Sequence, residues 1–250
     1  PGNIKDMADW AFCEGINRII FHRYAHQAYN NIKPGISMGP WGLHYERTQT
    51  WWDMSTEWHK YLSRCQYMLQ QGLFVADILY LTEELMPGAW HANKTIDETI
   101  PDELIREKSR YSFDGCPPEA LIERAFVKDG KIYFPDGMNY KILVLPNSQT
   151  MSVKLLKKIQ ELVHNGAVVI GERPLKSVGL TGYPESDIEV QKIAAELWGN
   201  CEGKKIKERK YGKGIIICGK NPEEVLIDLK IQPDFESDQR LRYIHRVIDG

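Results

Sequence analysis

The chain has 250 residues, 42% of them hydrophobic, which is enough for a packed core over one or two domains and excludes a disordered chain. The formal net charge is -2, from 32 basic and 34 acidic residues, so the composition predicts neither nucleic-acid nor anionic-membrane binding. No stretch of about 18 apolar residues occurs, which excludes a predicted membrane span.

The first quarter of the chain predicts two helices joined by a strand and a long loop. The spacing of apolar residues predicts a helix over 4–14, followed by a short buried strand over 17–24. A loop rich in glycine, proline and aromatic residues then covers 25–52. The second helix spans 54–71, with Asp53 as its expected cap.

From residue 73 onward, short apolar strands alternate with amphipathic helices. This alternation predicts an open, mostly parallel α/β sheet. The strands are predicted at 74–81, 141–146, 167–172 and 214–219, the helices at 102–110, 152–165 and 187–198, and a hairpin at 125–135 around Asp129-Gly130. The domain organisation that we expect is 1–72, then 73–236, then the start of a further domain over 237–250, with its first strand at 241–248.

The segment between Phe21 and Trp52 holds the candidate site. Polar residues at the carboxyl end of a predicted strand lie where parallel β/α architectures place their active sites. Tryptophan faces can stack on sugar rings, while carboxylates and imidazoles bind hydroxyl groups and move protons. The candidate residues are His22, His26, Trp41, His44, Glu46 and Arg47.

Other interpretations of these residues remain open. Trp58 lies on the apolar stripe of the second helix and is more simply a core residue, and His22 could be a core histidine. Glu46 could form a surface ion pair with Arg47. Glu14, between a helix and a strand, is expected at a solvated helix end, on the side of a barrel away from the chemistry.

The five cysteines show no metal-binding spacing, so neither zinc nor a dense disulfide framework is predicted. We interpret them as small, mostly buried hydrophobic residues. They are Cys13, Cys65, Cys116, Cys201 and Cys218.

Three long strings carry a resemblance to a known family. They read DWAFCEGINRIIFHRYAHQ, PGISMGPWGLHYERTQTWW and YLSRCQYMLQQGLFVADILYL, and the likeness continues through DGKIYFPDGMNYKILVLP. The sequence resembles the α-L-rhamnosidases of glycoside hydrolase family 106 over nearly its whole length. The string WGLHYERTQTWW is far more specific than a short motif.

The resemblance implies the end of a (β/α)8 barrel and hydrolysis of terminal α-L-rhamnose from plant-type polysaccharides with inversion. It places the catalytic base at Glu46 and implies a calcium ion near the sugar, with Glu14 as a candidate ligand despite its expected position. The general acid is expected upstream of Pro1, so residues 1–250 alone are expected to be inactive. The implied partners are a carbohydrate and the other domains of the same polypeptide, in a periplasmic or secreted bacterial enzyme.

The second domain resembles the glutamine-amidotransferase-like domain that follows the barrel in several glycosidase families, with a flavodoxin-like sheet. An active amidotransferase needs a cysteine nucleophile at a tight strand–helix turn. The turn after residue 146 reads Asn-Ser-Gln-Thr, so we expect a structural module. The alternatives to a rhamnosidase are a non-catalytic flavodoxin-like scaffold and another exo-glycosidase such as a β-galactosidase.

Overall fold

The computed structural model describes residues 2–248 except 23, 30, 34, 38, 41–43, 85–109 and 240. Trp41 and nearly all of the helix predicted at 102–110 therefore lie outside the described residues. The chain forms two compact units, one of residues 1–74 with 242–250 and one of residues 75–241. Within the described chain, no helix combines the length and the apolar character needed to cross a membrane.

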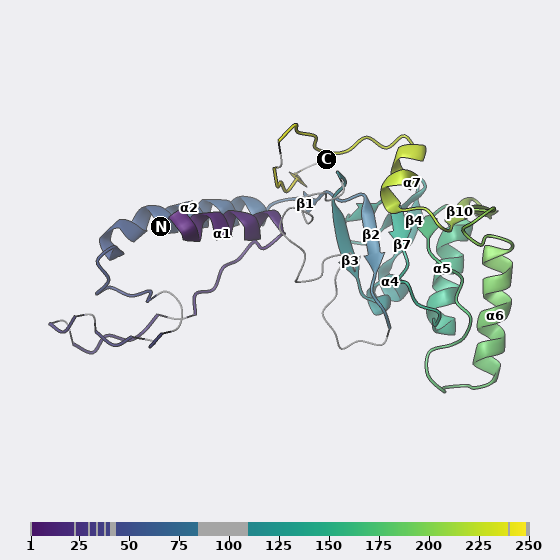
Figure 1. Ribbon diagram of the computed structural model, residues 1–250, viewed down its shortest axis with the longest axis horizontal. Helices are drawn as coiled ribbons and strands as arrows, with labels where there is room; N and C mark the ends of the chain where they lie inside the picture. The colour runs from purple at the N-terminus through teal and green to yellow at the C-terminus, as the bar shows by residue number, and fades with distance from the viewer. Residues whose placement is uncertain are drawn as a thin grey trace. The chain divides into compact units, whose positions relative to one another are not determined.

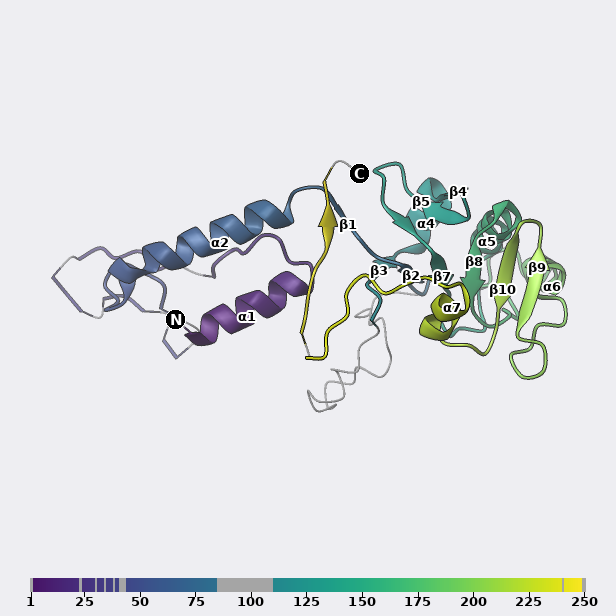
Figure 2. The ribbon, with the colours of Figure 1, turned by 90° about the horizontal axis from the view of Figure 1, so that it is seen from above.

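Two helices that lie side by side and run in the same direction are the main regular elements of unit 1, α1 (Gly2–Cys13) and α2 (Ser55–Leu69) (Figures 1 and 2). Ala8 and Phe12 of α1 are buried against Leu62 of α2, and Trp58 packs on this cluster. The interpretation of Trp58 as a core residue is thus confirmed. A 3-10 helix, η1 (Trp52–Met54), leads into α2, so Asp53 lies inside η1 and does not cap α2.

The prediction of a strand at 17–24 is wrong. No β-ladder forms along the described residues of this segment, and the Ile20 side chain is 85% exposed. Helix α2 satisfies the backbone instead: Ile19 N–H donates to the Gln66 side chain at 2.8 Å, and the Gln70 side chain donates to the carbonyl of Asn17 at 2.9 Å. Apolar periodicity could not reveal that side-chain amides replace a partner strand here.

The strand predicted at 74–81 is divided between the two units. Its first residues form β1 (Leu73–Phe74), which pairs antiparallel with β11 (Arg246–Val247) at the end of the chain. The remainder forms β2 (Ile78–Leu81). At the break, the Asp77 carbonyl accepts hydrogen bonds from the N–H groups of Lys141 and Ile142, so the chain changes partner strands there.

A six-stranded sheet forms the centre of unit 2. Its order is β3-β2-β7-β8-β10-β9, with β9 antiparallel to β10 and every other neighbouring pair parallel. The parallel pairing of the four strands that the sequence predicts is confirmed, while β3 and β9 were not predicted. The bounds are β3 Phe113–Cys116, β7 Ile142–Val144, β8 Val168–Ile170, β9 Glu208–Tyr211 and β10 Gly214–Ile217.

Helices cover this sheet. Residues Ile78, Ile142 and Val168 share one face, which α7 (Pro222–Asp228) covers with Val225 and Leu226. Helices α5 and α6 lie on the opposite side from α7 (Figure 2). Their bounds, with the short helix α4, are α4 Pro118–Arg124, α5 Val153–Asn165 and α6 Glu185–Trp198.

The predicted hairpin around Asp129-Gly130 is confirmed. Strand β4 (Phe126–Lys128) pairs with β5 (Lys131–Tyr133), and β6 (Asn139–Tyr140) completes a small antiparallel sheet. Both turn residues have positive φ, 51° at Asp129 and 74° at Gly130, as the type I′ turn of a two-residue hairpin requires.

Candidate functional site

An aromatic cluster in unit 1 surrounds the Tyr45 ring. It comprises Phe21, Tyr45, Trp51, Trp52 and His59. Phe21 stacks on Tyr45 with ring centres 4.4 Å apart, and Trp51 and Trp52 meet the Tyr45 ring edge-on at 5.3 and 5.7 Å. Tyr45 itself is 6% exposed, so its ring is the buried centre of the cluster. Burial raises the pKa of the Tyr45 phenol.

His59 joins helix α2 to this cluster and was missed in the sequence. Its Nε2 contacts the Tyr45 hydroxyl, and its ring lies 5.5 Å from the Tyr45 ring. Ser55 and His59 lie four residues apart in α2, and residues at this spacing share one helix face, but the sequence does not show what this face contacts. Ser55 is buried and His59 is half-buried on that face.

Glu46 follows Tyr45 directly and is 1% exposed. Its carboxylate accepts hydrogen bonds from within its own turn. The backbone N–H of Thr48 donates to one oxygen at 2.6 Å, and the Thr48 hydroxyl and the Gln49 side chain donate to the other, the latter at 3.2 Å. Glu46 is therefore a buried turn residue, which removes the interpretation of a surface ion pair with Arg47.

Opposing effects set the charge of Glu46. Burial works to raise the pKa of its carboxyl group. The hydrogen bonds from Thr48 and Gln49 and the charge of Arg47 outweigh burial and hold the pKa below its ordinary value. Glu46 is thus ionised at neutral pH, which a general base requires. In this conformation both carboxylate oxygens accept hydrogen bonds from the turn itself.

Arg47 and Gln27 hold the loop beside this turn. Arg47 Nη2 donates to the Gln27 carbonyl at 2.7 Å. The buried Gln27 side chain bonds both backbone groups of Ile36, accepting from its N–H at 2.7 Å and donating to its carbonyl at 2.6 Å. Gly35 is required there, because a Cβ at this position would lie 2.1 Å from Gln27 Oε1. Like His59, the buried Gln27 was not among the candidate residues chosen from the sequence.

Two of the other predicted site residues, His22 and His26, are not brought together with Glu46 in the described structure. His22 and His26 are exposed, and no hydrogen bond or ring contact links them to the Glu46 turn in the described structure. His44 is half-buried next to Tyr45. Trp41 lies outside the described residues.

A calcium site is not seen in the described part of the chain. No group of three or more histidine, cysteine, aspartate or glutamate side chains comes together there. Glu14, the candidate ligand, instead binds Arg242 in an ion pair, and the Arg242 guanidinium lies 5.8 Å from the Trp10 ring centre. Glu14 is therefore paired and is not simply a solvated helix end.

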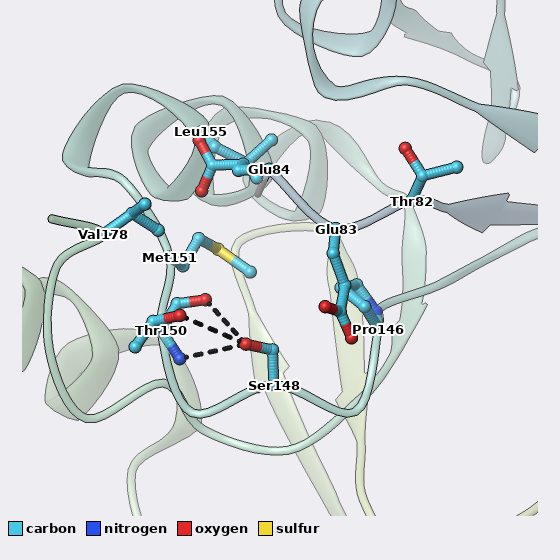
Figure 3. A pocket seen from close by; sticks show the side chains of 9 residues that line it. All are labelled: Thr82, Glu83, Glu84, Pro146, Ser148, Thr150, Met151, Leu155 and Val178. Atoms are coloured by element: carbon cyan, nitrogen blue, oxygen red, sulfur yellow. Dashed lines mark hydrogen bonds between the residues drawn. The ribbon is translucent and has the colours of Figure 1, made fainter. Parts of the chain in front are cut away.

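A small hollow in unit 2 lies at the carboxyl ends of β2 and β7 (Figure 3). Glu84 stands at its rim and accepts a hydrogen bond of 2.6 Å from the backbone N–H of Ser152, the cap of helix α5. The Ser148 hydroxyl bonds Thr150 within the same turn. In many nucleotide-binding folds a helix N-terminus at such a place binds a phosphate. Here a carboxylate of the chain itself lies at that position.

The cysteines of unit 2 lack the properties of a nucleophile. Burial raises the pKa of Cys116 to about 12 and raises that of Cys218 as well. An activated cysteine has the opposite shift, because the thiolate is the reactive form. Both side chains are buried, at 3% and 0% exposed.

Comparisons with known proteins identify the family of this chain. The sequence matches the family described as alpha-L-rhamnosidase, glycoside hydrolase family 106, over residues 1–250. A curated protein of Formosa agariphila named "Putative beta-glucuronidase" is 36% identical over 249 residues, covering 100% of this chain and 20% of that protein. A solved rhamnosidase from Novosphingobium sp. PP1Y has a TM-score of 0.82 and 27% identity, covering 96% of this chain and 22% of that one. The chain, which spans about a fifth of each relative, belongs to glycoside hydrolase family 106, the α-L-rhamnosidase family.

Proposed function

We propose that the full-length protein removes terminal α-L-rhamnose from plant-type polysaccharides by an inverting, two-carboxylate mechanism. The family match over the whole chain is the observation that supports this most directly. In inverting hydrolysis one carboxyl group protonates the leaving oxygen and a carboxylate opposite activates water, about 6.5–9.5 Å away. Glu46 is our proposed base, and we assign the acid to a part of the protein outside residues 1–250.

The charge state and support of Glu46 favour this role. Its hydrogen bonds from Thr48 and Gln49 keep it ionised, and Tyr45 at the preceding position anchors the turn in the aromatic cluster. The half-buried Trp51 and Trp52 supply aromatic surface of the kind that stacks on a pyranose ring. We propose that His22, His26, Trp41, His44 and Arg47 line the sugar site in the complete enzyme.

The domain roles are part of the proposal. We propose that residues 1–72 are the end of a (β/α)8 barrel, that 73–236 form an amidotransferase-like module and that 237–250 begin a further domain. The sheet order of unit 2 has the 2-1-3-4 arrangement of flavodoxin-like sheets at β3-β2-β7-β8. Glu84 at the start of α5 and the raised thiol pKa values support a structural role for this module.

A second candidate activity is β-glucuronide hydrolysis. The 36% identical relative carries that name, while the solved structure is a rhamnosidase. A glucuronide has a carboxylate where rhamnose has a methyl group, so a site for it needs a cationic partner. The exposed Arg47 is such a cation, although its Nη2 donates to the Gln27 carbonyl.

The test is the activity of the full-length protein on aryl glycosides. We expect turnover of the aryl α-L-rhamnoside, with the β-anomer of rhamnose as the first product in NMR spectra, and little turnover of the β-glucuronide and β-galactoside. Faster turnover of the glucuronide would show that a glucuronide, not a rhamnoside, is the preferred substrate. Release of α-rhamnose as the first product would overturn the inverting mechanism. Residues 1–250 alone are expected to be inactive.

Calcium binding and a periplasmic or secreted location remain proposals for the full-length protein. A calcium ion, where bound, would supply positive charge to sugar hydroxyl groups. The described residues contain no group of three or more histidine, cysteine, aspartate or glutamate side chains for it, so none of the steps above depends on the ion.

A further inference from the structure

Two thiols of unit 2 lie unusually close together. Cys201 follows the end of α6, and Cys218 follows β10. Their Sγ atoms are 2.7 Å apart, with both residues present as thiols. A disulfide bond measures about 2.05 Å. Even carbon atoms, which are smaller than sulfur, stay about 3.5–4.0 Å apart when they are not bonded.

The backbone on both sides holds the two cysteines in this arrangement. Cys201 N–H donates to the Trp198 carbonyl at 2.9 Å, and Cys218 N–H donates to the Lys207 carbonyl at 2.9 Å. The two segments also approach each other closely next to the thiols, since a Cβ at Gly219 would lie 2.2 Å from the carbonyl oxygen of Gly203. Backbone contacts thus hold the two segments that carry the thiols next to each other.

We propose that Cys201 and Cys218 form a disulfide bond in the protein when it folds in an oxidising environment. The oxidant is an exchangeable disulfide, either of a small molecule or of a thiol–disulfide oxidoreductase. One cysteine thiolate attacks the oxidant, forms a mixed disulfide and releases the first oxidant thiol. The second cysteine thiolate then attacks the sulfur of its partner, the new S–S bond forms, and the second oxidant thiol leaves. Two protons and two electrons pass from the cysteines to the oxidant.

Burial determines when this exchange takes place. Cys201 is 6% exposed and Cys218 is 0% exposed in the folded unit. Burial also raises the pKa of both thiols, so the folded unit holds little reactive thiolate. The bond therefore forms during folding, while the thiols can still meet the oxidant, and resists reduction afterward.

Peptide mapping tests the proposal on the full-length protein. Trypsin separates the two cysteines into the peptides 193–204 and 214–220, each with a single cysteine. The protein is refolded with a mixture of reduced and oxidised glutathione, alkylated in denaturant and digested without reductant. We expect the two peptides as one linked species that is about 2 Da lighter than their sum, because two hydrogens are lost. Reduction of this protein should lower its melting temperature by roughly 5 °C.

Three variants control the result. Cys201→Ser and Cys218→Ser should each abolish the linked species, while Cys116→Ser, which changes another buried thiol of unit 2, should leave it intact. Recovery of both peptides alkylated as free thiols from refolded wild-type protein overturns the proposal, as does a link from either cysteine to a different one. The wild-type comparison alone decides the matter if a variant fails to fold.

Discussion

The backbone N–H of Thr48 donates a 2.6 Å hydrogen bond to the Glu46 carboxylate, while the hydroxyl of the same residue donates to the other carboxylate oxygen. Both bonds favour the ionised form of Glu46, in which both oxygens are full acceptors. They therefore lower the pKa of Glu46 even though burial acts in the opposite direction. Burial of a charged carboxylate is costly unless hydrogen bonds compensate it, as they do for Glu46, and perturbed buried groups of this kind are clear targets for mutation.

Glu46→Gln in the full-length protein should lower kcat at least about a hundredfold with little change in KM. The amide keeps the shape of the side chain and accepts one hydrogen bond from the turn, but it has no basic oxygen. Steady-state kinetics on an aryl α-L-rhamnoside measure the effect. Arg47→Gln is the matched neighbour and should retain much more of kcat. Near wild-type kcat in Glu46→Gln would remove Glu46 from the mechanism and leave it as a turn residue.

Thr48→Val should move the acidic limb of the kcat/KM profile to higher pH. The Thr48 hydroxyl favours ionised Glu46, so its loss raises the pKa of Glu46, and the base is then protonated at a higher pH. The backbone N–H donor remains, so the shift should be partial. Thr56→Val, on the exposed side of α2, is the matched control and should leave the profile unchanged. An unmoved limb in Thr48→Val would mean that another group controls it.

Tyr45→Phe should lower the free energy of unfolding of unit 1 by about 1–3 kcal/mol, because it leaves His59 without its hydroxyl partner in a half-buried place. Hydrogen exchange of the α2 amides in the full-length protein reports this local stability. His59→Phe alone should be similarly harmful, and the double variant should be less harmful than the sum of the two. Additive effects would show that the contact contributes nothing beyond packing.

The sequence was sufficient for the elements whose pattern is local. The Asp129-Gly130 pair predicted its hairpin, and the apolar stripe through Trp58 predicted α2. It failed where distant partners decide the structure. The run at 17–24 looks like a strand, but the side chains of Gln66 and Gln70 take the place of a neighbouring strand. No local pattern shows which segment, 50 or so residues away, will supply the hydrogen bonds.

The candidate site shows the same division. The cluster of aromatic and charged residues around Glu46 could be found by eye in the sequence, and the structure does join Tyr45, Trp51 and Trp52. The role of His59 needed the direction of a helix face, which comes only once α2 is in place. The division of the strand at 74–81 could not be foreseen either, because its first half pairs with the other end of the chain.

Asp77→Asn should stabilise unit 2 at neutral pH. Asp77 is 7% exposed, and burial raises its pKa above the ordinary value, with Lys141 opposing this only in part. The folded state therefore binds a proton more tightly than the unfolded state, so stability falls as the pH rises through the unfolded pKa and toward the folded one. Removal of the charge should eliminate this loss. Hydrogen exchange of the β2 and β7 amides measures it.

The gain from Asp77→Asn should be largest at neutral pH and disappear below about pH 3, where Asp77 is protonated in both states. Asp136→Asn is the control, since the Asp136 side chain is 50% exposed and pairs with Arg124 at the surface. Its effect should stay within about 0.5 kcal/mol. Equal stability of Asp77→Asn and wild type at every pH would show that the buried charge costs nothing.

Gly72→Ala should separate β1 from β11. Gly72 has a φ of 60°, and a Cβ there would lie 2.1 Å from the carbonyl oxygen of Val247. The same junction holds Arg246, whose guanidinium donates to the carbonyls of Gln71 and Gly72 at 2.6 Å. The methyl group can be accommodated only if the backbone moves, which breaks the pairing of Leu73 with Val247. Faster hydrogen exchange at both strands in the full-length protein is the expected result.

Gly15→Ala separates this clash from the cost of backbone conformation. Gly15 also has positive φ, 93°, but a Cβ there would meet nothing within 4 Å. Its replacement should therefore cost only the left-handed backbone strain, about 1–2 kcal/mol. Gly72→Ala carries the same strain and the collision with Val247 in addition, so it should be the more harmful of the two. If the two variants lose equal stability, the close approach of residue 72 to the end of the chain does not hold in the protein.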